Sequence, residues 1–209
     1  MNRRTLFALP LLLVPGLTRA APAVVPLVLT PQDRTDLGRI EQYLNGLRTL
    51  KGRFLQIAPD GGTSEGTVWL QRPGRMRFEY DPPAPFLLVA GFGILTFQDR
   101  KLDQVSNIPL GQTPLGILLA DQVKLSGDVT VTELHREPGL IAVTTQRAGS
   151  PGDGSLTLYF DDKPLALRQW AVVDAQRRET RVSLYNVELG QSFDQALFNA
   201  ATIQKQPVR

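Results

Sequence analysis

The stretch "WLQRPGRMRFEYDPP", residues 69–83, shows the most regular alternation of polar and apolar residues in its second half. From residue 75 onward it alternates strictly between polar and apolar side chains. Because successive side chains of a strand point to opposite faces, Met76, Phe78 and Tyr80 share one face, while Arg77 and Glu79 share the other. The pattern predicts a strand with one wet face and one apolar face. The apolar face belongs either to a closed core or to a surface that receives an apolar ligand.

The same period of two continues along most of the chain. It predicts strands at residues 50–57, 67–72, 75–80, 86–90, 94–98, 102–106, 129–135, 140–147, 155–160, 166–174 and 180–187. Helical spacing predicts an amphipathic helix at 31–46, opened by Thr30-Pro31, a short apolar helix at 113–120, opened by Thr113-Pro114, and one closing turn at 194–198. We therefore expect a mainly β fold with some α, in which two helices lie against one curled antiparallel sheet or barrel.

The first twenty residues, MNRRTLFALPLLLVPGLTRA, have the three parts of a secretory signal. Arg3 and Arg4 give a positive start, an apolar middle follows, and small residues precede the cleavage point before Ala21. The apolar middle is too short to cross a membrane as a helix. We predict a cleaved signal peptide at 1–20, a single domain at 21–209, and a periplasmic address. The arginine pair leaves Sec and twin-arginine export both open.

Composition narrows the classes of function. The chain has no cysteine, so it folds without disulfides and cannot itself be a lipoprotein. Of its 23 basic side chains, Arg3, Arg4 and Arg19 lie in the predicted signal, which leaves 20 basic and 20 acidic side chains in the mature chain. A chain so close to neutral argues against nucleic acid as a partner.

Little in the sequence supports catalysis. His135 is the one histidine, no Gly-x-Ser-x-Gly elbow is present, and the His and Cys clusters that usually hold metals are missing. We expect His135 to be a solvated residue, and we expect no enzymatic activity, metal or permanent cofactor.

The run from Gly66 to Pro83, which contains Trp69-Leu70 and Arg72-Pro73-Gly74-Arg75, is followed by "TPLGILLA" at 113–120 and "LTLYFDDKPLALRQWAVVDAQRRETRVSLYNVELG" at 156–190. Together these segments resemble the LolA family of periplasmic outer-membrane lipoprotein carriers. The likeness runs over about residues 36–198.

The resemblance implies an incomplete, half-open barrel of about eleven strands, closed by a helical lid over an apolar concave face. It implies a chaperone that binds the acyl chains of lipoproteins released from the inner membrane by an ABC transporter. The cargo then passes to an outer-membrane acceptor, either a protein or the membrane itself. It also implies that Arg72 latches the lid by hydrogen bonds to backbone. We expect the protein to act as a monomer.

The resemblance places Met76 and Phe78 on the concave face, and strand parity extends the set. We expect a lipid-binding cavity lined by Leu50, Phe54, Leu70, Met76, Phe78, Tyr80, Leu88 and Trp170, with the inner surface of the lid formed by Leu115, Leu118 and Leu119. Each of these residues has plain core packing as its alternative.

Three other functions stay open at this point. The same fold could carry or sense free lipid. A periplasmic hydrolase could use His135. The chain could also be an envelope interaction protein whose cavity is filled by its own side chains.

Overall fold

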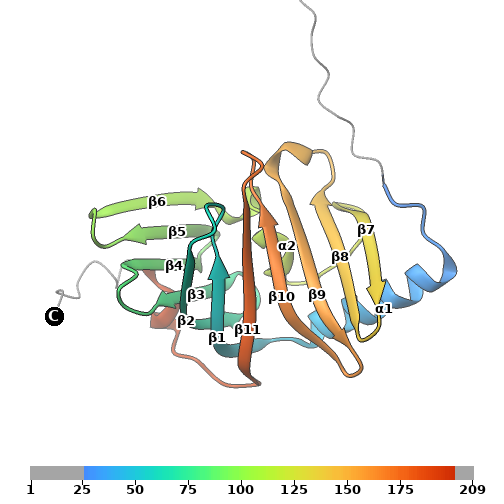
Figure 1. Ribbon diagram of the computed structural model, residues 1–209, viewed down its shortest axis with the longest axis horizontal. Coiled ribbons are helices and arrows are strands. Elements are labelled where there is room, and N and C mark those ends of the chain that lie inside the picture. Colours follow the sequence, from blue (N-terminus) through green and yellow to red (C-terminus); the bar gives the residue numbers. More distant parts are fainter. Residues whose placement is uncertain (1–25, 201–209) are drawn as a thin grey trace, which may run out of the picture.

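A computed structural model describes residues 26–200 and shows one antiparallel sheet of eleven strands (Figure 1). The elements in chain order are α1 (Pro31–Gly46), β1 (Thr49–Ile57), β2 (Thr63–Gln71), β3 (Arg75–Tyr80), β4 (Phe86–Gly91), β5 (Ile94–Asp99), β6 (Gln104–Pro109), η1 (Leu110–Gln112), α2 (Leu115–Leu118), β7 (Val129–Glu137), β8 (Leu140–Arg147), η2 (Pro151–Asp153), β9 (Ser155–Asp162), β10 (Leu165–Val173), β11 (Glu179–Leu189) and η3 (Gln195–Phe198). The mainly β fold with some helix is confirmed. The expected signal peptide at residues 1–20 lies outside the described residues.

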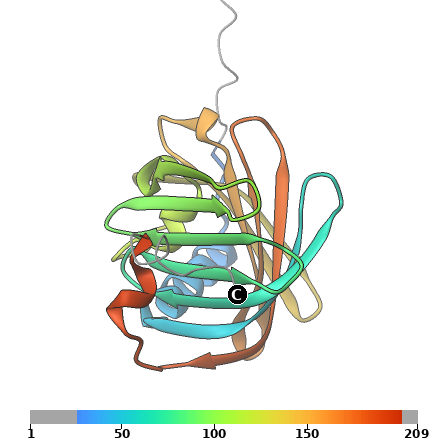
Figure 2. The same cartoon turned by 90° about the vertical axis from the view of Figure 1, so that its left-hand side faces the viewer.

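The strand order is β6-β5-β4-β3-β2-β1-β11-β10-β9-β8-β7. Every neighbouring pair is consecutive in the chain except β1 and β11, which pair from Leu50–Leu189 to Ile57–Arg181 and join the two meanders. The sheet is not closed, because β6 and β7 remain as its two edges. Figure 2 shows α1 lying inside the curve of the sheet and η3 lying outside it.

Several predicted strand boundaries differ from the observed ones: β2, for example, begins at Thr63 and not at residue 67. The sixth strand shows one physical cause. It begins at Gln104 and not at residue 102. The Asp99 carboxylate accepts hydrogen bonds from the backbone nitrogens of Lys101 and Leu102, and Asp103 has a φ of 52°. Residues 100–103 are therefore held in a turn, because an Asp side chain bonded to nearby backbone competes with strand pairing.

Helix α1 has the predicted bounds. Thr30 is its N-cap, and Asp33 completes a capping box: Asp33 N donates to Thr30 Oγ1 at 3.2 Å, and Thr30 N donates to Asp33 Oδ2 at 2.7 Å. Pro31 stands at the first position, where its missing N–H costs nothing.

The second helix is shorter than expected. Helix α2 covers only Leu115–Leu118, and Thr113 does not cap it. The Thr113 hydroxyl instead donates to Leu110 O at 2.9 Å, which ends the preceding turn η1. Among the described residues, no helix is long and apolar enough to cross a membrane.

Candidate functional site

Strand pairing places the apolar face of β3 on the concave side of the sheet. Met76 lies opposite Leu70 on β2, and Phe78 lies opposite Val68 on β2 and Leu88 on β4. Directly opposite residues of an antiparallel pair share a face. These five side chains therefore form one continuous apolar surface, in which only Leu88 is partly exposed.

Six aromatic rings from five strands make a row across this concave surface. Trp170 meets Phe78 with ring centroids 6.0 Å apart, and Phe78 meets Phe54 at 4.7 Å. Phe54 meets Tyr80 at 5.1 Å in an edge-to-face contact. The row continues through Phe86 to Phe97, with centroids 5.7 and 5.6 Å apart. It thus runs from the buried interior to the partly exposed ring of Phe97 near the open edge of the sheet.

The Tyr80 hydroxyl in this row has a hydrogen-bond partner. Tyr80 Oη donates to Gln56 Oε1 at 2.7 Å. Burial raises the pKa of the Tyr80 phenol to about 12, although the hydrogen bond with Gln56 acts in the opposite direction. Tyr80 is therefore neutral at any physiological pH and adds no charge to the apolar surface.

Two helical elements cover the concave surface. Helix α1 buries Leu37, Ile40 and Leu44 against it, and the α2 region buries Leu118 and Leu119. Buried side chains of the sheet and of the helices pack together in the interior. An apolar ligand must displace some of them to enter.

Arg72 lies directly after β2, at the junction of the two helical elements, and is almost fully buried. Its Nη1 donates to Leu44 O at the end of α1. Its Nε and Nη2 donate to Ala120 O at 3.0 and 2.5 Å, and Nη2 also donates to Asp121 O at 3.2 Å. One guanidinium thus bonds to the backbone of both covering elements. Its five N–H donors, arranged in one plane, make this possible.

The charge of Arg72 is not matched by a close carboxylate. Burial lowers the pKa of its guanidinium, nearby Arg48 lowers it further, and Asp121 acts against both. A guanidinium stays charged in spite of such a shift, because its ordinary pKa is above 12. The direct acceptors of this buried cation are the backbone carbonyl oxygens of Leu44, Ala120 and Asp121 and, at 3.5 Å, the side-chain oxygen of Asn45.

Helix α1 and the residues after α2 are also tied to each other. Asn45 Nδ2 donates to Val123 O at 3.0 Å, and Asn45 Oδ1 accepts from Val123 N at 2.8 Å. Glu41 Oε1 accepts from Leu125 N at 2.6 Å. These two side chains of α1 therefore provide hydrogen-bond partners for the backbone of Val123 and Leu125.

The structure brings all the predicted cavity residues into one cluster. Ten of the eleven are buried, and Leu88 is partly buried against the same cluster. That these residues contact a ligand stays a prediction. Sequence reasoning missed the other half of the surface, which includes Leu156, Leu158 and Phe160 on β9. Their alternation with polar residues was visible in the sequence and could have identified them.

The expectation of a wet outer face on β3 is wrong at Arg77. The C-terminal turn η3 covers this part of the outer face, where Leu87, Val89 and Phe198 are buried. Arg77 is buried there, donating to Glu79 Oε2 at 2.9 Å and to Leu197 O at 3.3 Å. Alternation on β3 could not reveal this cover, because the covering residues lie 120 positions later in the chain.

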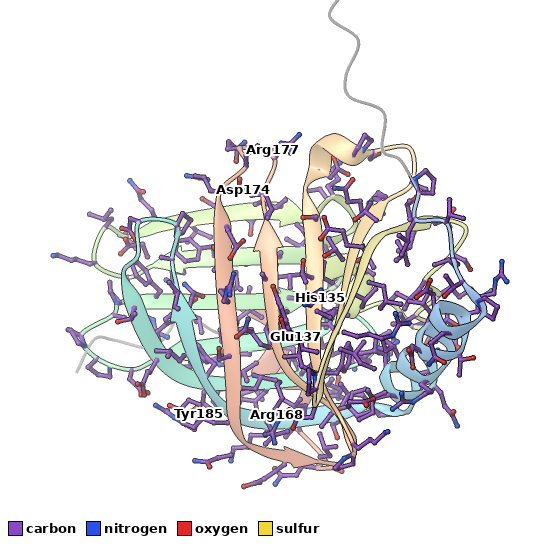
Figure 3. All side chains as sticks on the ribbon, turned by 45° about the vertical axis from the view of Figure 1, so that its right-hand side comes forward. His135, Glu137, Arg168, Asp174, Arg177 and Tyr185 are labelled. Carbon is purple, nitrogen blue, oxygen red and sulfur yellow. The ribbon has the colours of Figure 1, made fainter. Side chains whose placement is uncertain are left out.

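His135 lies on β7, and its side chain is 64% exposed (Figure 3). In the part of the chain that the structure describes, its ring bonds only to Glu137 Oε1, at 2.9 Å, on the same strand. Among residues 26–200, no group of three or more His, Cys, Asp or Glu side chains could hold a metal ion.

A curled, unclosed sheet with an apolar concave face beneath a tied helical cover defines a class: binding proteins that enclose apolar groups. Comparison with known proteins narrows this class. The sequence model of the family described as "Outer membrane lipoprotein carrier protein LolA" matches residues 45–201. The chain belongs to this LolA family.

Three curated relatives carry the name outer-membrane lipoprotein carrier protein. The chain is 30% identical to the protein of Azotobacter vinelandii, over 85% of this chain and 90% of the relative. It is 28% identical to that of Methylococcus capsulatus, over 79% and 83%. It is 33% identical to that of Pseudomonas syringae pv. syringae, over 69% and 70%.

Proposed function

We propose that this protein is a periplasmic chaperone that carries lipoproteins between the two membranes and shields their acyl chains beneath the lid. The observation that carries the proposal is the position of Arg72, whose guanidinium bonds to both covering elements above an apolar concave face. The curated relatives named as outer-membrane lipoprotein carriers support the same function. The protein acts by binding and release and not by catalysis.

The energies suit reversible loading. Each hydrogen bond of Arg72 contributes about 0.5–3 kcal/mol, depending on how much burial penalises the freed group. Moving an acyl chain out of water contributes about 0.8 kcal/mol per methylene. Acyl chains can therefore displace Arg72 from the carbonyls, while the empty protein stays closed.

The partners follow from this cycle. An inner-membrane ABC transporter supplies the lipoprotein, because extracting acyl chains from a bilayer requires energy. An outer-membrane acceptor receives it, and the acceptor must bind the chains better than this protein does, since a ligand can only shift an equilibrium by its difference in affinity. The predicted export signal and the near-neutral mature chain suit free movement through the periplasm.

A release assay tests the function. Purified protein beginning at Ala21 is added to spheroplasts, and the supernatant is examined for a soluble complex with a fully acylated outer-membrane lipoprotein. We expect a one-to-one complex. Free phospholipid as the only bound molecule would contradict the proposal and support a free-lipid carrier, and lipoproteins that stay on the membrane would contradict it outright.

A matched pair of variants makes the assay specific. Phe78→Asp puts a charge into the concave surface and should abolish release, whereas Glu188→Gln, on the exposed part of β11, should leave release unchanged. Circular dichroism of both variants checks that the fold survives.

A further inference from the structure

Helix α1 is fixed to the sheet at both ends. Its C-terminal end joins β1 directly, since only Leu47 and Arg48 separate Gly46 from Thr49. Its N-terminal end carries Asp33 and Asp36, whose carboxylates are almost fully buried. A short covalent connection and buried charges both resist movement of the helix.

The buried carboxylates of α1 take part in a compact charge cluster. Arg136 of β7 donates through Nη2 to Asp33 Oδ1 and through Nε to Asp36 Oδ2, both at 2.8 Å. Arg39 donates to Asp36 Oδ1 at 3.0 Å, and to the carboxylate and carbonyl of Asp162 on β9 at 3.0 and 2.9 Å. Charge-assisted bonds of this kind are roughly twice as strong as neutral ones. Removing one partner would leave a buried charge uncompensated.

The pKa shifts agree with this geometry. The Thr30 hydroxyl, the Thr30 backbone and Arg136 together hold the pKa of Asp33 down to about 2. Burial alone would raise the pKa of Asp36, but hydrogen bonds from Gln32, Arg136 and Arg39 lower it. Both carboxylates are therefore charged throughout the physiological range.

The α2 segment, which we define as residues 110–125, is held differently. It contributes only backbone groups to its hydrogen bonds with the rest of the protein. Leu110 N donates to Gly93 O, Leu119 O accepts from Gly74 N, and Val123 bonds to Asn45 through its nitrogen and its carbonyl. Two of its partners are charged side chains: Arg72 donates to Ala120 O and Asp121 O, and Glu41 accepts from Leu125 N. Among the described residues its one ion pair joins Asp121 to Arg48 at 3.7 Å, with both side chains more than half exposed. Such an exposed pair contributes little.

We propose that α1 is a fixed wall of the interior and that the α2 segment alone moves when the interior opens. Arg136 is then a positioning residue that keeps α1 in place. On opening, Arg72 keeps Leu44 O and releases Ala120 O and Asp121 O, and Asn45 loses Val123. That acyl chains drive this movement rests on the proposed function; the difference in mobility between the two elements does not.

Hydrogen exchange on the empty protein tests the inference without any cargo. In Arg72→Leu we expect amide exchange in residues 115–125 to rise about tenfold or more, while residues 33–42 change less than about twofold. Arg136→Gln should show the opposite pattern, with faster exchange in 33–42 and little change in 115–125. Equal acceleration of both regions in Arg72→Leu would overturn the proposal, because α1 and the α2 segment would then move as one body.

Spin-label distances test the role of Arg136 in the loaded protein. The chain has no cysteine, so labels can be placed at chosen positions. The pair Gln122→Cys with Arg168→Cys measures the distance from the α2 segment to β10, and the pair Arg34→Cys with Arg168→Cys measures the distance from α1 to β10 (Figure 3 labels Arg168). On adding a synthetic triacylated lipopeptide, the Gln122 pair should shift and the Arg34 pair should not. In the Arg136→Gln background the Arg34 pair should shift as well, and Arg136→Lys should partly restore the original behaviour.

The two proposals fail in different ways. If native mass spectrometry shows that the lipopeptide does not bind, the proposed function is contradicted. The hydrogen-exchange experiment then still tests whether α1 is fixed while the α2 segment moves. A lipopeptide that binds and shifts the Arg34 pair as far as the Gln122 pair overturns the fixed wall and leaves the carrier function standing.

Discussion

The ring of Phe54 lies over Gly66, its partner across the β1–β2 pair. A Cβ placed on Gly66 would come within 2.7 Å of Phe54 Cε1 and within 2.1 Å of the backbone oxygen of Glu79. Glycine at this position therefore lets the Phe54 ring settle into the concave surface and contact Phe78 and Tyr80. The arrangement of the aromatic row depends on a residue that has no side chain.

Gly66→Ala should lower the free energy of unfolding by about 1–3 kcal/mol, because the fully buried Phe54 ring or the backbone must shift. Urea denaturation measures the effect. Gly38→Ala is the matched control: Gly38 lies on the exposed side of α1 with nothing within 4 Å of an added Cβ, so the same change should stabilise by up to about 1 kcal/mol. A neutral Gly66→Ala would show that the ring does not need this glycine.

Arg72→Leu should open the interior. The change removes the side-chain donor from the carbonyls of Ala120 and Leu44, at a cost of about 1–3 kcal/mol, although Leu44 O keeps the backbone nitrogen of Leu47. Binding of an apolar fluorescent dye should rise, and Arg72→Lys should give an intermediate result because an ammonium cannot reach both carbonyls as a fork does. Arg75→Leu, on the neighbouring strand, is the control. Dye binding equal in the Arg72 and Arg75 variants would argue against a latch.

Stability should fall in acid partly through Asp33. Its pKa is 3.8 ordinarily and about 2 in the folded protein, with the Thr30 hydroxyl as the largest cause. A lowered folded-state pKa stabilises the fold above the ordinary value, and that contribution disappears as the pH falls through the folded value. The difference in unfolding free energy between wild type and Asp33→Asn should therefore be constant above about pH 5 and shrink toward pH 2. A difference that stays constant down to pH 2 would contradict the shift.

Tyr80 should ionise later than an ordinary tyrosine. Burial raises its pKa to about 12 from an ordinary value of 10.0. Because the unfolded chain releases this proton first, stability should decrease as the pH rises above 10. Absorbance titration of wild type against Tyr80→Phe isolates this group among the four tyrosines. A difference spectrum with a midpoint near 10 would mean that water reaches the phenol.

Trp170 should report on the ligand directly. It is almost fully buried against Phe78, whereas Trp69, the other tryptophan, is half-buried opposite Arg77 on the outer face. A lipopeptide with brominated acyl chains should quench the fluorescence of Trp69→Phe, which keeps Trp170, and should leave Trp170→Phe nearly unchanged. Equal quenching of the two variants would place the acyl chains outside the concave surface.

Much of this architecture could be predicted from local pattern. The strand boundaries of β3 and β8 and the full extent of α1 follow from periods of two and of 3.6 and from the Thr30 cap. The sixth strand shows where such patterns stop being sufficient, because the Asp99 turn overrides the apolar residue Leu102 that had suggested a strand. The prediction that Thr113 caps the second helix is also wrong, because its hydroxyl donates to Leu110 O in the preceding turn.

Near neighbours in the chain are sufficient to predict which residues of each strand are apolar, where α1 begins and ends, and that Arg72 follows a strand with an apolar face. The contacts of those faces depend on the tertiary structure. Arg77 is buried because η3 reaches it, and Arg136 finds Asp36 a hundred positions away. Such contacts form between segments that come together only when the whole sheet curls, so no local periodicity encodes them. The positions of α1 and of the α2 segment against the sheet are therefore properties of the assembled fold.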